Sequence, residues 1–224
     1  MRFVRENSLS LFFLILFLAS LAGQSYAGHL DNNEELRAHD DPAISYGRYV
    51  VSSKFGVAVM ENWQSEFLQF FLFILATIWL LQKGSNESKR LDDAGFESEA
   101  EQRVGRHASP RSPGWARRAS GWRYHVYANS LLLLMGLIFL WCWLAESVTG
   151  WTEYNADQLD HGEQTVSWLS YIGTPDFWEK SLQNWQSEFL AVGTMAVFTV
   201  YLRQRGSPES KPVGAPHDET GTSG

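Results

Sequence analysis

Cysteine is almost absent from this sequence, with Cys142 the only one among 224 residues. A chain with one thiol cannot form an internal disulfide or a paired-thiol redox centre, which excludes a disulfide scaffold and thiol-oxidising chemistry within one copy. Because Cys142 lies inside an apolar run, we expect it to be a small packing residue.

Charge is absent from four stretches of the chain. A bilayer core about 30 Å thick needs about 20 helical residues, so each stretch can span it once a few flanking residues are included. The mean hydropathy is only −0.21 because the segments between the stretches are polar. The sequence therefore predicts an all-α integral membrane protein with four transmembrane helices. The uncharged stretches are residues 9–22, 67–81, 131–145 and 189–202.

Motifs that would indicate an enzyme are also missing. The sequence has no glycine-rich nucleotide loop, nucleophile elbow or metalloprotease helix. His39 and His161 lie among carboxylates, but neither has a second histidine three or four residues away, so they are weak metal ligands and we predict no metal site. No histidine falls inside a predicted span, which disfavours a bis-histidine haem. We expect no enzymatic activity, no cofactor and no nucleic-acid partner.

A seven-residue stretch at 62–68, NWQSEFL, returns unchanged at 184–190. Shifting the sequence by 122 positions aligns 7–89 with 129–211 without a gap, with 28 identities in 83 pairs. A period this long that occurs twice indicates two copies of one folding unit. Because each copy carries two spans, both copies have the same orientation, and the repeat is parallel.

The first repeat covers residues 1–89 and is expected to cross the membrane twice, with an outer loop at 28–62 that includes a short surface helix near 43–51. Gly84 and Gly206 are expected to cap the second span of each copy. The second repeat covers residues 125–211, with an outer loop at 148–184. The predicted spans are 7–27, 63–82, 126–147 and 185–204.

The segment between the repeats, 90–124, is rich in Ser, Gly, Pro and charged residues and lacks apolar periodicity. This composition predicts a disordered cytoplasmic linker, and residues 212–224 are expected to form a disordered tail. The basic half of the linker precedes the third span, so Arg117, Arg118 and Arg123 are expected to contact lipid head groups.

The first span also resembles a signal peptide, because basic residues precede it and Ser25-Tyr26-Ala27 follows it as a small-x-small cleavage site. Its counterpart in the second copy is internal and cannot be removed. We therefore expect both to be retained, with cleavage as the alternative.

Orientation follows from the distribution of Lys and Arg. With a cytoplasmic amino terminus, 14 of the 18 basic residues lie on the cytoplasmic side and 4 on the outer side. Such an excess favours cytoplasmic placement of both termini. We expect a multi-pass protein of the bacterial inner membrane.

The doubled NWQSEFL, the GSxESK sequence that follows each copy, and the ending RQRGSPESKPVGAPHDETG resemble a bacterial family of four-helix integral membrane proteins that is described as a domain of unknown function. The resemblance covers nearly the whole chain. It implies a four-helix prokaryotic membrane protein and supplies no catalytic residues.

Polar side chains are expected to meet in one layer near the outer surface. Counting about 20 residues from the inner end of each span places them at similar depth, just below Trp63 and Trp185 at the aromatic-belt level. Such ionisable groups usually face the bundle interior. These side chains act either as structural contacts between helices, with Lys180 neutralising Glu188, or as a cation or proton site. The layer comprises Gln24, Gln64, Glu66, Glu146, Gln186 and Glu188.

These features favour a structural or accessory membrane protein that contacts lipid and a protein partner or a second copy of the chain. The alternative is a small transporter or channel-like protein that uses the carboxylates Glu66, Glu146 and Glu188. The absence of charge through the middle of all four spans favours the accessory function, because ion paths generally need polar groups at mid-membrane depth.

Overall fold

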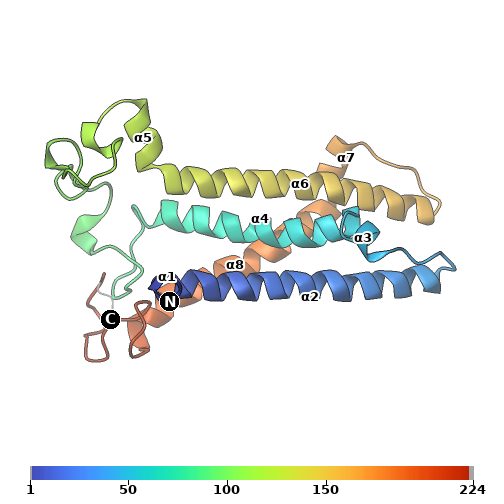
Figure 1. Cartoon of the computed structure of the whole chain (residues 1–224), viewed down its shortest axis with the longest axis horizontal. Coiled ribbons are helices and arrows are strands. Elements are labelled where there is room, and N and C mark those ends of the chain that lie inside the picture. The colour runs from blue at the N-terminus through green and yellow to red at the C-terminus, as the bar shows by residue number, and fades with distance from the viewer. Residues whose placement is uncertain (1, 222–224) are drawn as a thin grey trace. The chain divides into compact units, whose positions relative to one another are not determined.

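The computed structural model describes residues 2–221, and every regular element within them is a helix (Figure 1). Four long helices alternate with short ones and with three single-turn 3-10 helices in the linker. The elements are α1 (Arg2–Glu6), α2 (Ser8–Ala38), α3 (Tyr46–Tyr49), α4 (Ser53–Ala76), η1 (Leu91–Asp93), η2 (Gly105–His107), η3 (Ala116–Arg118), α5 (Trp122–Ala128), α6 (Ser130–Asp160), α7 (Trp168–Ile172) and α8 (Pro175–Tyr201).

The chain forms two compact units. The first unit comprises Met1–Met60 and Ala145–Ile172, and the second comprises Glu61–Leu144 and Gly173–Gly224. The helices α4 and α6 therefore each contribute one end to each unit.

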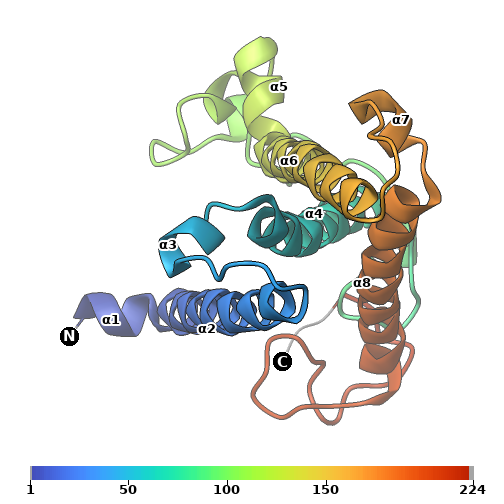
Figure 2. The same ribbon diagram turned by 90° about the vertical axis from the view of Figure 1, so that its right-hand side faces the viewer.

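In the first unit, the loop after α2 folds back along that helix and places α3 beside it (Figure 2). Asn33 fixes the returning backbone at Ile44. Its side-chain amide donates to the Ile44 carbonyl at 3.0 Å, and its side-chain oxygen accepts from the Ile44 amide at 2.8 Å. His29 also contacts the Ile44 carbonyl, at 2.8 Å. The side chain of Asn33 thus hydrogen-bonds to both the backbone N–H and the C=O of Ile44, a residue that lies outside the helices.

The same arrangement recurs 122 positions later, where the loop after α6 returns. Asn155 donates to the Val166 carbonyl at 3.0 Å and accepts from the Val166 amide at 2.8 Å. Trp151, in the position equivalent to His29, donates to the same carbonyl at 2.7 Å. We call these two sets of contacts the asparagine clamps.

Two glycines allow each short helix to approach its long helix closely. A Cβ atom at Gly28 would collide with the hydroxyl of Tyr49, and a Cβ atom at Gly150 would collide with the hydroxyl of Tyr171. Both tyrosines are buried. Only glycine leaves room for the tyrosine tip at these positions.

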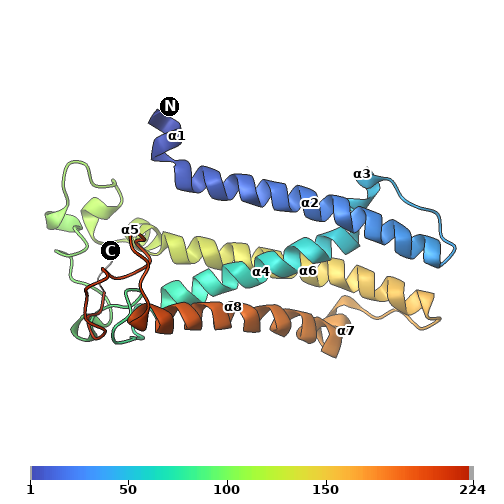
Figure 3. The ribbon, with the colours of Figure 1, turned by 90° about the horizontal axis from the view of Figure 1, so that it is seen from below.

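In the second unit, α4, α6 and α8 lie alongside one another (Figure 3). Aromatic side chains fill the contact between α6 and α8. The ring of Trp143 lies 5.8 Å from Phe177, 6.1 Å from Trp178 and 6.3 Å from Trp185 between centroids. Such edge and tilted arrangements add to the free energy of apolar burial.

The helix boundaries differ from the prediction, because α2 and α6 continue beyond the predicted spans. The helices do not end where the predicted spans end, at residues 27 and 147: α2 continues to Ala38 and α6 to Asp160, and the membrane boundaries of the spans remain a prediction. The added turns carry the side chains that form the asparagine clamps. The polar residues there are therefore helical and hold the loop, whereas we expected them to be part of it.

The helix α4 ends earlier than predicted. It stops at Ala76, not at residue 82, and Gly84 is consequently not its cap. The Thr77 hydroxyl bonds back to the carbonyls of Phe73 and Ile74, and the Ile78 carbonyl accepts from Gly95 at 2.7 Å. These contacts engage the groups that would otherwise continue the helix.

The end of α8 is also earlier than predicted, at Tyr201. Gly206 lies beyond it, Leu202 occupies the capping position, and the side chain of Arg203 binds the last carbonyls of the helix. Its guanidinium donates to the carbonyls of Thr199, Val200 and Leu202 at 2.8–3.3 Å. A cation at the negative end of a helix satisfies exposed carbonyls and opposes the dipole.

Two helices, α2 and α6, are long and apolar enough to cross a membrane. All four long helices have sufficient length, since 24 residues already extend about 36 Å at about 1.5 Å per residue. The helices α4 and α8 have polar first halves, and their charge-free parts, 67–76 and 189–201, are short. The structure therefore supports two apolar helices directly, while four spans remain a prediction.

The linker contains η1, η2, η3 and α5, and residues 212–221 form turns. The disorder of residues 90–124 and 212–224 remains a prediction.

The asparagine clamps predict a specific loss of stability. We expect Asn33→Ala and Asn155→Ala each to lower the free energy of unfolding by about 1–3 kcal/mol, because each leaves the backbone N–H of Ile44 or Val166 without a partner and removes one of the two donors to its C=O. Thermal unfolding in detergent micelles, followed by circular dichroism, measures the change. Glu34→Ala, at an exposed neighbouring position, is the control. Equal melting temperatures for the Asn33 and Glu34 variants would contradict the assigned role of Asn33.

Candidate functional site

The GSxESK sequence after each of α4 and α8 forms a closed loop. The hydroxyl of Ser88 accepts from the backbone N–H of Gln82 at 2.9 Å, and the hydroxyl of Ser210 accepts from the backbone N–H of Gln204 at the same distance. Each of these serines also donates to the carbonyl of the lysine that follows it. We call residues 82–89 and 204–211 the two serine-lysine loops.

The lysine of each loop binds backbone carbonyls. The ammonium group of Lys211 donates to the carbonyls of Pro216, His217 and Glu219, each at 3.0 Å, and the residue is only 1% exposed. Lys89 donates to the Gly95 carbonyl at 2.7 Å and forms an ion pair with Glu97. Since an ammonium group has three donors, Lys211 uses all of them on one turn of backbone.

The tail also contacts the first serine-lysine loop. The Gly84 amide donates to the Thr220 hydroxyl at 2.8 Å, and the Gly221 amide donates to the Ser85 carbonyl at 3.1 Å. The hydroxyls of Ser85 and Thr199 meet at 2.9 Å in a buried contact. The tail, both loops and the end of α8 are therefore one hydrogen-bonded layer at this end of the second unit.

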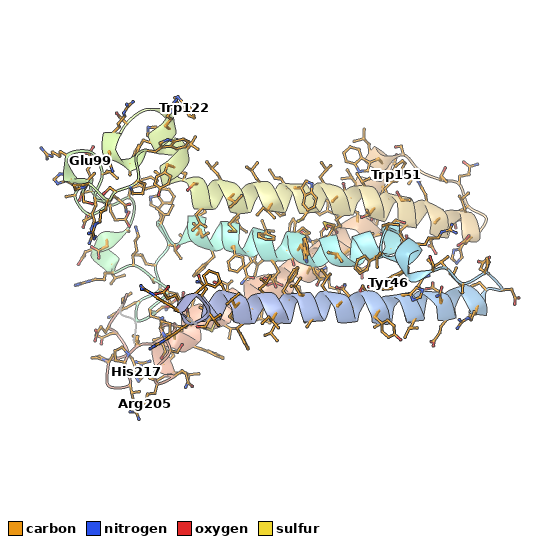
Figure 4. All side chains as sticks on the ribbon, viewed as in Figure 1. Tyr46, Glu99, Trp122, Trp151, Arg205 and His217 are labelled. Atoms are coloured by element: carbon orange, nitrogen blue, oxygen red, sulfur yellow. The ribbon has the colours of Figure 1, made fainter. Side chains whose placement is uncertain are left out.

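The linker lies at the same end of the second unit. Figure 4 shows Glu99 and Trp122 of the linker region at the end where Arg205 and His217 lie. This is the end at which α6 begins and α8 stops (Figure 1). Basic and acidic side chains therefore gather at one end of these helices.

Two equivalent glutamates, Glu87 and Glu209, face one another between the serine-lysine loops. Burial raises the pKa of Glu87 above its usual 4.5, and the neighbouring carboxylate of Glu209 raises it further. Both line a cavity of about 210 Å³ whose remaining wall is largely apolar. It includes Gln69, Phe70, Phe73, Ala191, Val192 and Met195.

The repeated heptapeptide forms contacts between α4 and α8. The indole of Trp185 donates to the side-chain oxygen of Gln64 at 2.7 Å, and Asn184 donates to Glu61 at 2.8 Å. Gln64 is fully buried. Polar residues of the heptapeptide thus join two helices.

Lys180 was expected to neutralise Glu188, but it forms its ion pair with Asp176 at 2.9 Å. Asp176 lies one helical turn before Lys180 in the same helix. Side chains four residues apart on a helix are neighbours, so the salt bridge forms with little loss of side-chain freedom.

The residues of the predicted polar layer are divided between the units. In the first unit, Gln24 is exposed and donates weakly to the Ala58 carbonyl at 3.4 Å, whereas Glu146 is 3% exposed. In the second unit, Glu66 is exposed, and Glu188 is half-buried and lies within electrostatic range of it. A single layer across all four helices remains a prediction.

The other predicted residues have varied surroundings. Gln186 is exposed, and Trp63 and Trp185 are half-buried, with Trp185 inside the aromatic cluster. Their position at the aromatic-belt level remains a prediction. His39 and His161 each contact a carbonyl of the preceding helix, at 2.9 and 2.8 Å.

No group of three or more metal-ligating side chains occurs within residues 2–221. The candidate site consists of the carboxylates of Glu87 and Glu209, which can take up a proton, and the largely apolar cavity that they line. The two serine-lysine loops carry both carboxylates. Nothing in this geometry supplies a nucleophile with an adjacent base.

The asparagine clamps were not among the residues predicted to be important. The repeat alignment already contained the information, because Gly28, Asn33 and Tyr49 are identical to Gly150, Asn155 and Tyr171. Identity between two copies marks residues that both copies need for the same contact. His29 was missed because the predicted first span ended two residues before it.

The raised pKa of Glu87 predicts a pH dependence of stability. The folded chain holds this proton more tightly than the unfolded chain, so stability should decrease as the pH rises from about 4.5 through the folded pKa. We expect Glu87→Gln to remove this decrease and to stabilise the protein at pH 7 by up to about 1 kcal/mol, a magnitude typical of a partly exposed charge pair.

Melting temperatures of the wild type and Glu87→Gln between about pH 4 and pH 8, in one detergent and at constant ionic strength, test this dependence. Glu99→Gln in the linker is the control. Parallel pH profiles for wild type and Glu87→Gln would show that the carboxylate pair does not affect stability.

A family model described as domain of unknown function DUF6766 matches residues 1–222. No curated protein and no solved structure gives a significant match. Since the family model covers almost the whole chain, the protein belongs to the DUF6766 family, whose defining domain has no assigned function.

Proposed function

We propose that the protein is an integral membrane protein with four transmembrane helices, in which two repeats of the same orientation form a structural or accessory component of a bacterial inner membrane. Both termini lie on the cytoplasmic side. The accessory function is a contact with lipid and with a protein partner or a second copy, without an enzymatic step.

The exposure of apolar helices supports membrane insertion. In the most apolar stretch of α2 only 6% of the residues are buried, and in the most apolar stretch of α6 only 17% are buried. The core helix of a soluble protein would be mostly buried, whereas lipid can cover such a surface.

The helices α4 and α8 also expose apolar side chains. Large apolar residues of α8 in contact with solvent include Phe189, Leu190, Val197 and Phe198, and those of α4 include Phe70 and Leu72. Their polar first halves would lie near the outer surface, and the segments 77–82 and 202–204 would continue through the inner head-group region. This supports two further spans despite their lower hydropathy.

Recurring contacts support the duplication. The asparagine contacts of the clamps and the serine contacts of the serine-lysine loops each occur twice with the same donor and acceptor atoms, 122 positions apart. In addition, α4 and α8 run in the same direction in the second unit (Figure 3). Two copies of one unit with equal orientation would have this property.

The orientation is supported by the basic residues at one end of the second unit. Because Trp122, Arg205 and His217 lie at the end where α6 begins, the linker and the tail would face the same side of the membrane. An excess of Lys and Arg in these segments favours the cytoplasmic side.

The observation that favours an accessory function over transport is the pairing of polar residues between α4, α6 and α8. Trp185 binds Gln64, Asn184 binds Glu61, and Trp143 binds Ser181. Side chains paired in this way stabilise helix association, and they are then not available to coordinate a moving ion.

The alternative function is a small transporter or channel-like protein that uses Glu66, Glu146 and Glu188, and the pair Glu66 and Glu188 lies within one unit. Their mutual proximity favours it, because two carboxylates at one level can bind a cation or share a proton.

Topology can be tested with single cysteines introduced into a Cys142→Ser background. We expect an impermeant maleimide to label Asp40→Cys and Glu163→Cys in intact cells, and to label Asp92→Cys and Val213→Cys only after permeabilisation. Labelling of Asp92→Cys in intact cells, or labelling of Asp40→Cys and Glu163→Cys only after permeabilisation, would overturn the four-span topology.

Transport can be tested with full-length protein in proteoliposomes that contain a pH-sensitive dye. The accessory function predicts proton and sodium flux equal to that of protein-free vesicles, for the wild type and for the double variant Glu66→Gln/Glu188→Gln alike. Flux in the wild type that falls at least tenfold in the double variant would instead establish the transporter function.

A further inference from the structure

A pocket of about 370 Å³ lies directly before α6, between η3 and α5 of the second unit. Two tryptophans and two arginines dominate its wall: Trp115, Arg118, Trp122 and Arg123. Apolar aromatic surface and fixed positive charge thus face the same small volume.

The two arginines of this pocket have no internal charge partner. Within residues 2–221, neither Arg118 nor Arg123 forms an ion pair, and neither donates a side-chain hydrogen bond to protein. The guanidinium of Arg123 lies 5.3 Å from the ring centroid of Trp122. A planar guanidinium without a carboxylate partner is well suited to bidentate binding of a phosphate group.

Arg117 differs from both of these arginines. Its guanidinium donates to the carbonyls of Ser112 and Pro110, so it holds the linker turn that carries the pocket. Of the three arginines expected to contact lipid, one is therefore structural, and the other two line the pocket.

Beside the pocket, between the lining residues Arg118 and Ser120, the backbone has a conformation that occurs in anion sites. Ala119 follows the 3-10 turn η3 with φ of 49° and ψ of 16°, in the left-handed region. A right-handed residue followed by a left-handed one turns successive backbone N–H groups toward one side and forms an anion-binding concavity.

The tryptophans indicate where this anion would be found. Trp115 is 45% exposed and Trp122 is 68% exposed, and their ring centroids are 6.2 Å apart. Indole rings with this exposure, only a few residues before an apolar helix, match the level of membrane head groups. Basic pockets beside a transmembrane helix on the cytoplasmic side commonly receive lipid phosphates.

We propose that Arg118 and Arg123 bind the phosphate of an anionic phospholipid, while Trp115 and Trp122 contact its glycerol and ester region. This inference rests on the proposed membrane insertion of α6, and it identifies the lipid contact of the accessory function as a specific site. Lipid bound in this pocket would hold the linker against the cytoplasmic leaflet, at the point where α6 enters the membrane.

The test uses purified full-length protein in a neutral detergent, titrated with dioleoylphosphatidylglycerol or dioleoylphosphatidylcholine and followed by native mass spectrometry. A basic residue near an anionic surface contributes roughly a fivefold change in affinity, so Arg118→Gln/Arg123→Gln should weaken phosphatidylglycerol binding by about 25-fold. The matched control, Arg103→Gln/Arg106→Gln, removes the same charge elsewhere in the linker and should change affinity by less than about twofold.

Three outcomes would overturn the proposal. Equal binding of the two lipids to the wild type would remove the requirement for anionic lipid. An equal loss of affinity in both double variants would indicate general charge attraction without a pocket. Displacement of phosphatidylglycerol by millimolar glycerol 3-phosphate would indicate a site for a soluble phosphate compound.

The same preparation separates this proposal from the proposed function. Cysteine labelling of Arg118→Gln/Arg123→Gln should give the same topology as the wild type, and circular dichroism should give the same helix content. If topology and helicity are preserved but phosphatidylglycerol affinity is unchanged, the pocket is not a lipid site and the membrane protein remains as proposed. If the wild type does not insert into membranes, the proposed function itself fails.

Discussion

A backbone that leaves a helix and returns along it must find partners for its N–H and C=O groups, because an unpaired group in a packed contact costs about as much as a lost hydrogen bond. In each half of the chain one asparagine meets this requirement, since its amide presents a donor and an acceptor in the same geometry as a peptide. The pairs Asn33 with Ile44 and Asn155 with Val166 therefore fix where the loop turns back. The positions of Tyr49 and Tyr171, and of the glycines beneath them, follow from that turn.

The heptapeptide shows that equal sequence does not require equal contacts. Trp185 donates to Gln64, and Asn184 donates to Glu61, a residue whose equivalent in the second copy is Gln183. The sequence differs directly before the shared motif, so that α4 carries the carboxylate of Glu61 where α8 carries the amide of Gln183. A polar pair across a helix interface stabilises one relative placement of the helices, because other placements would leave its members unpaired.

The sequence was sufficient to predict four long helices and their order, because long uncharged runs are a strong pattern that local contacts seldom override. It was insufficient for the helix ends. The polar residues after Ala27 look like a loop by composition, yet they are helical because Asn33 and His29 bind the returning backbone. Conversely, the run at 67–81 looks continuous, but the helix stops at Ala76, and beyond it the Ile78 carbonyl accepts from the distant Gly95. Both differences arise from contacts distant in sequence, which periodicity does not encode.

The basic residues at the linker end of the second unit fall into two physical classes. Lys89, Arg117, Arg203 and Lys211 bind carbonyl oxygens of the protein and act as internal crosslinks for the linker and the tail. A cation that is satisfied in this way contributes less to binding at a membrane surface than its presence in a charge count suggests. Arg118 and Arg123 differ because their charges remain unpaired beside exposed indole rings. In the proposed membrane protein, the orientation of the chain can depend on all of these charges during insertion, whereas the proposed binding of an anionic lipid depends on Arg118 and Arg123.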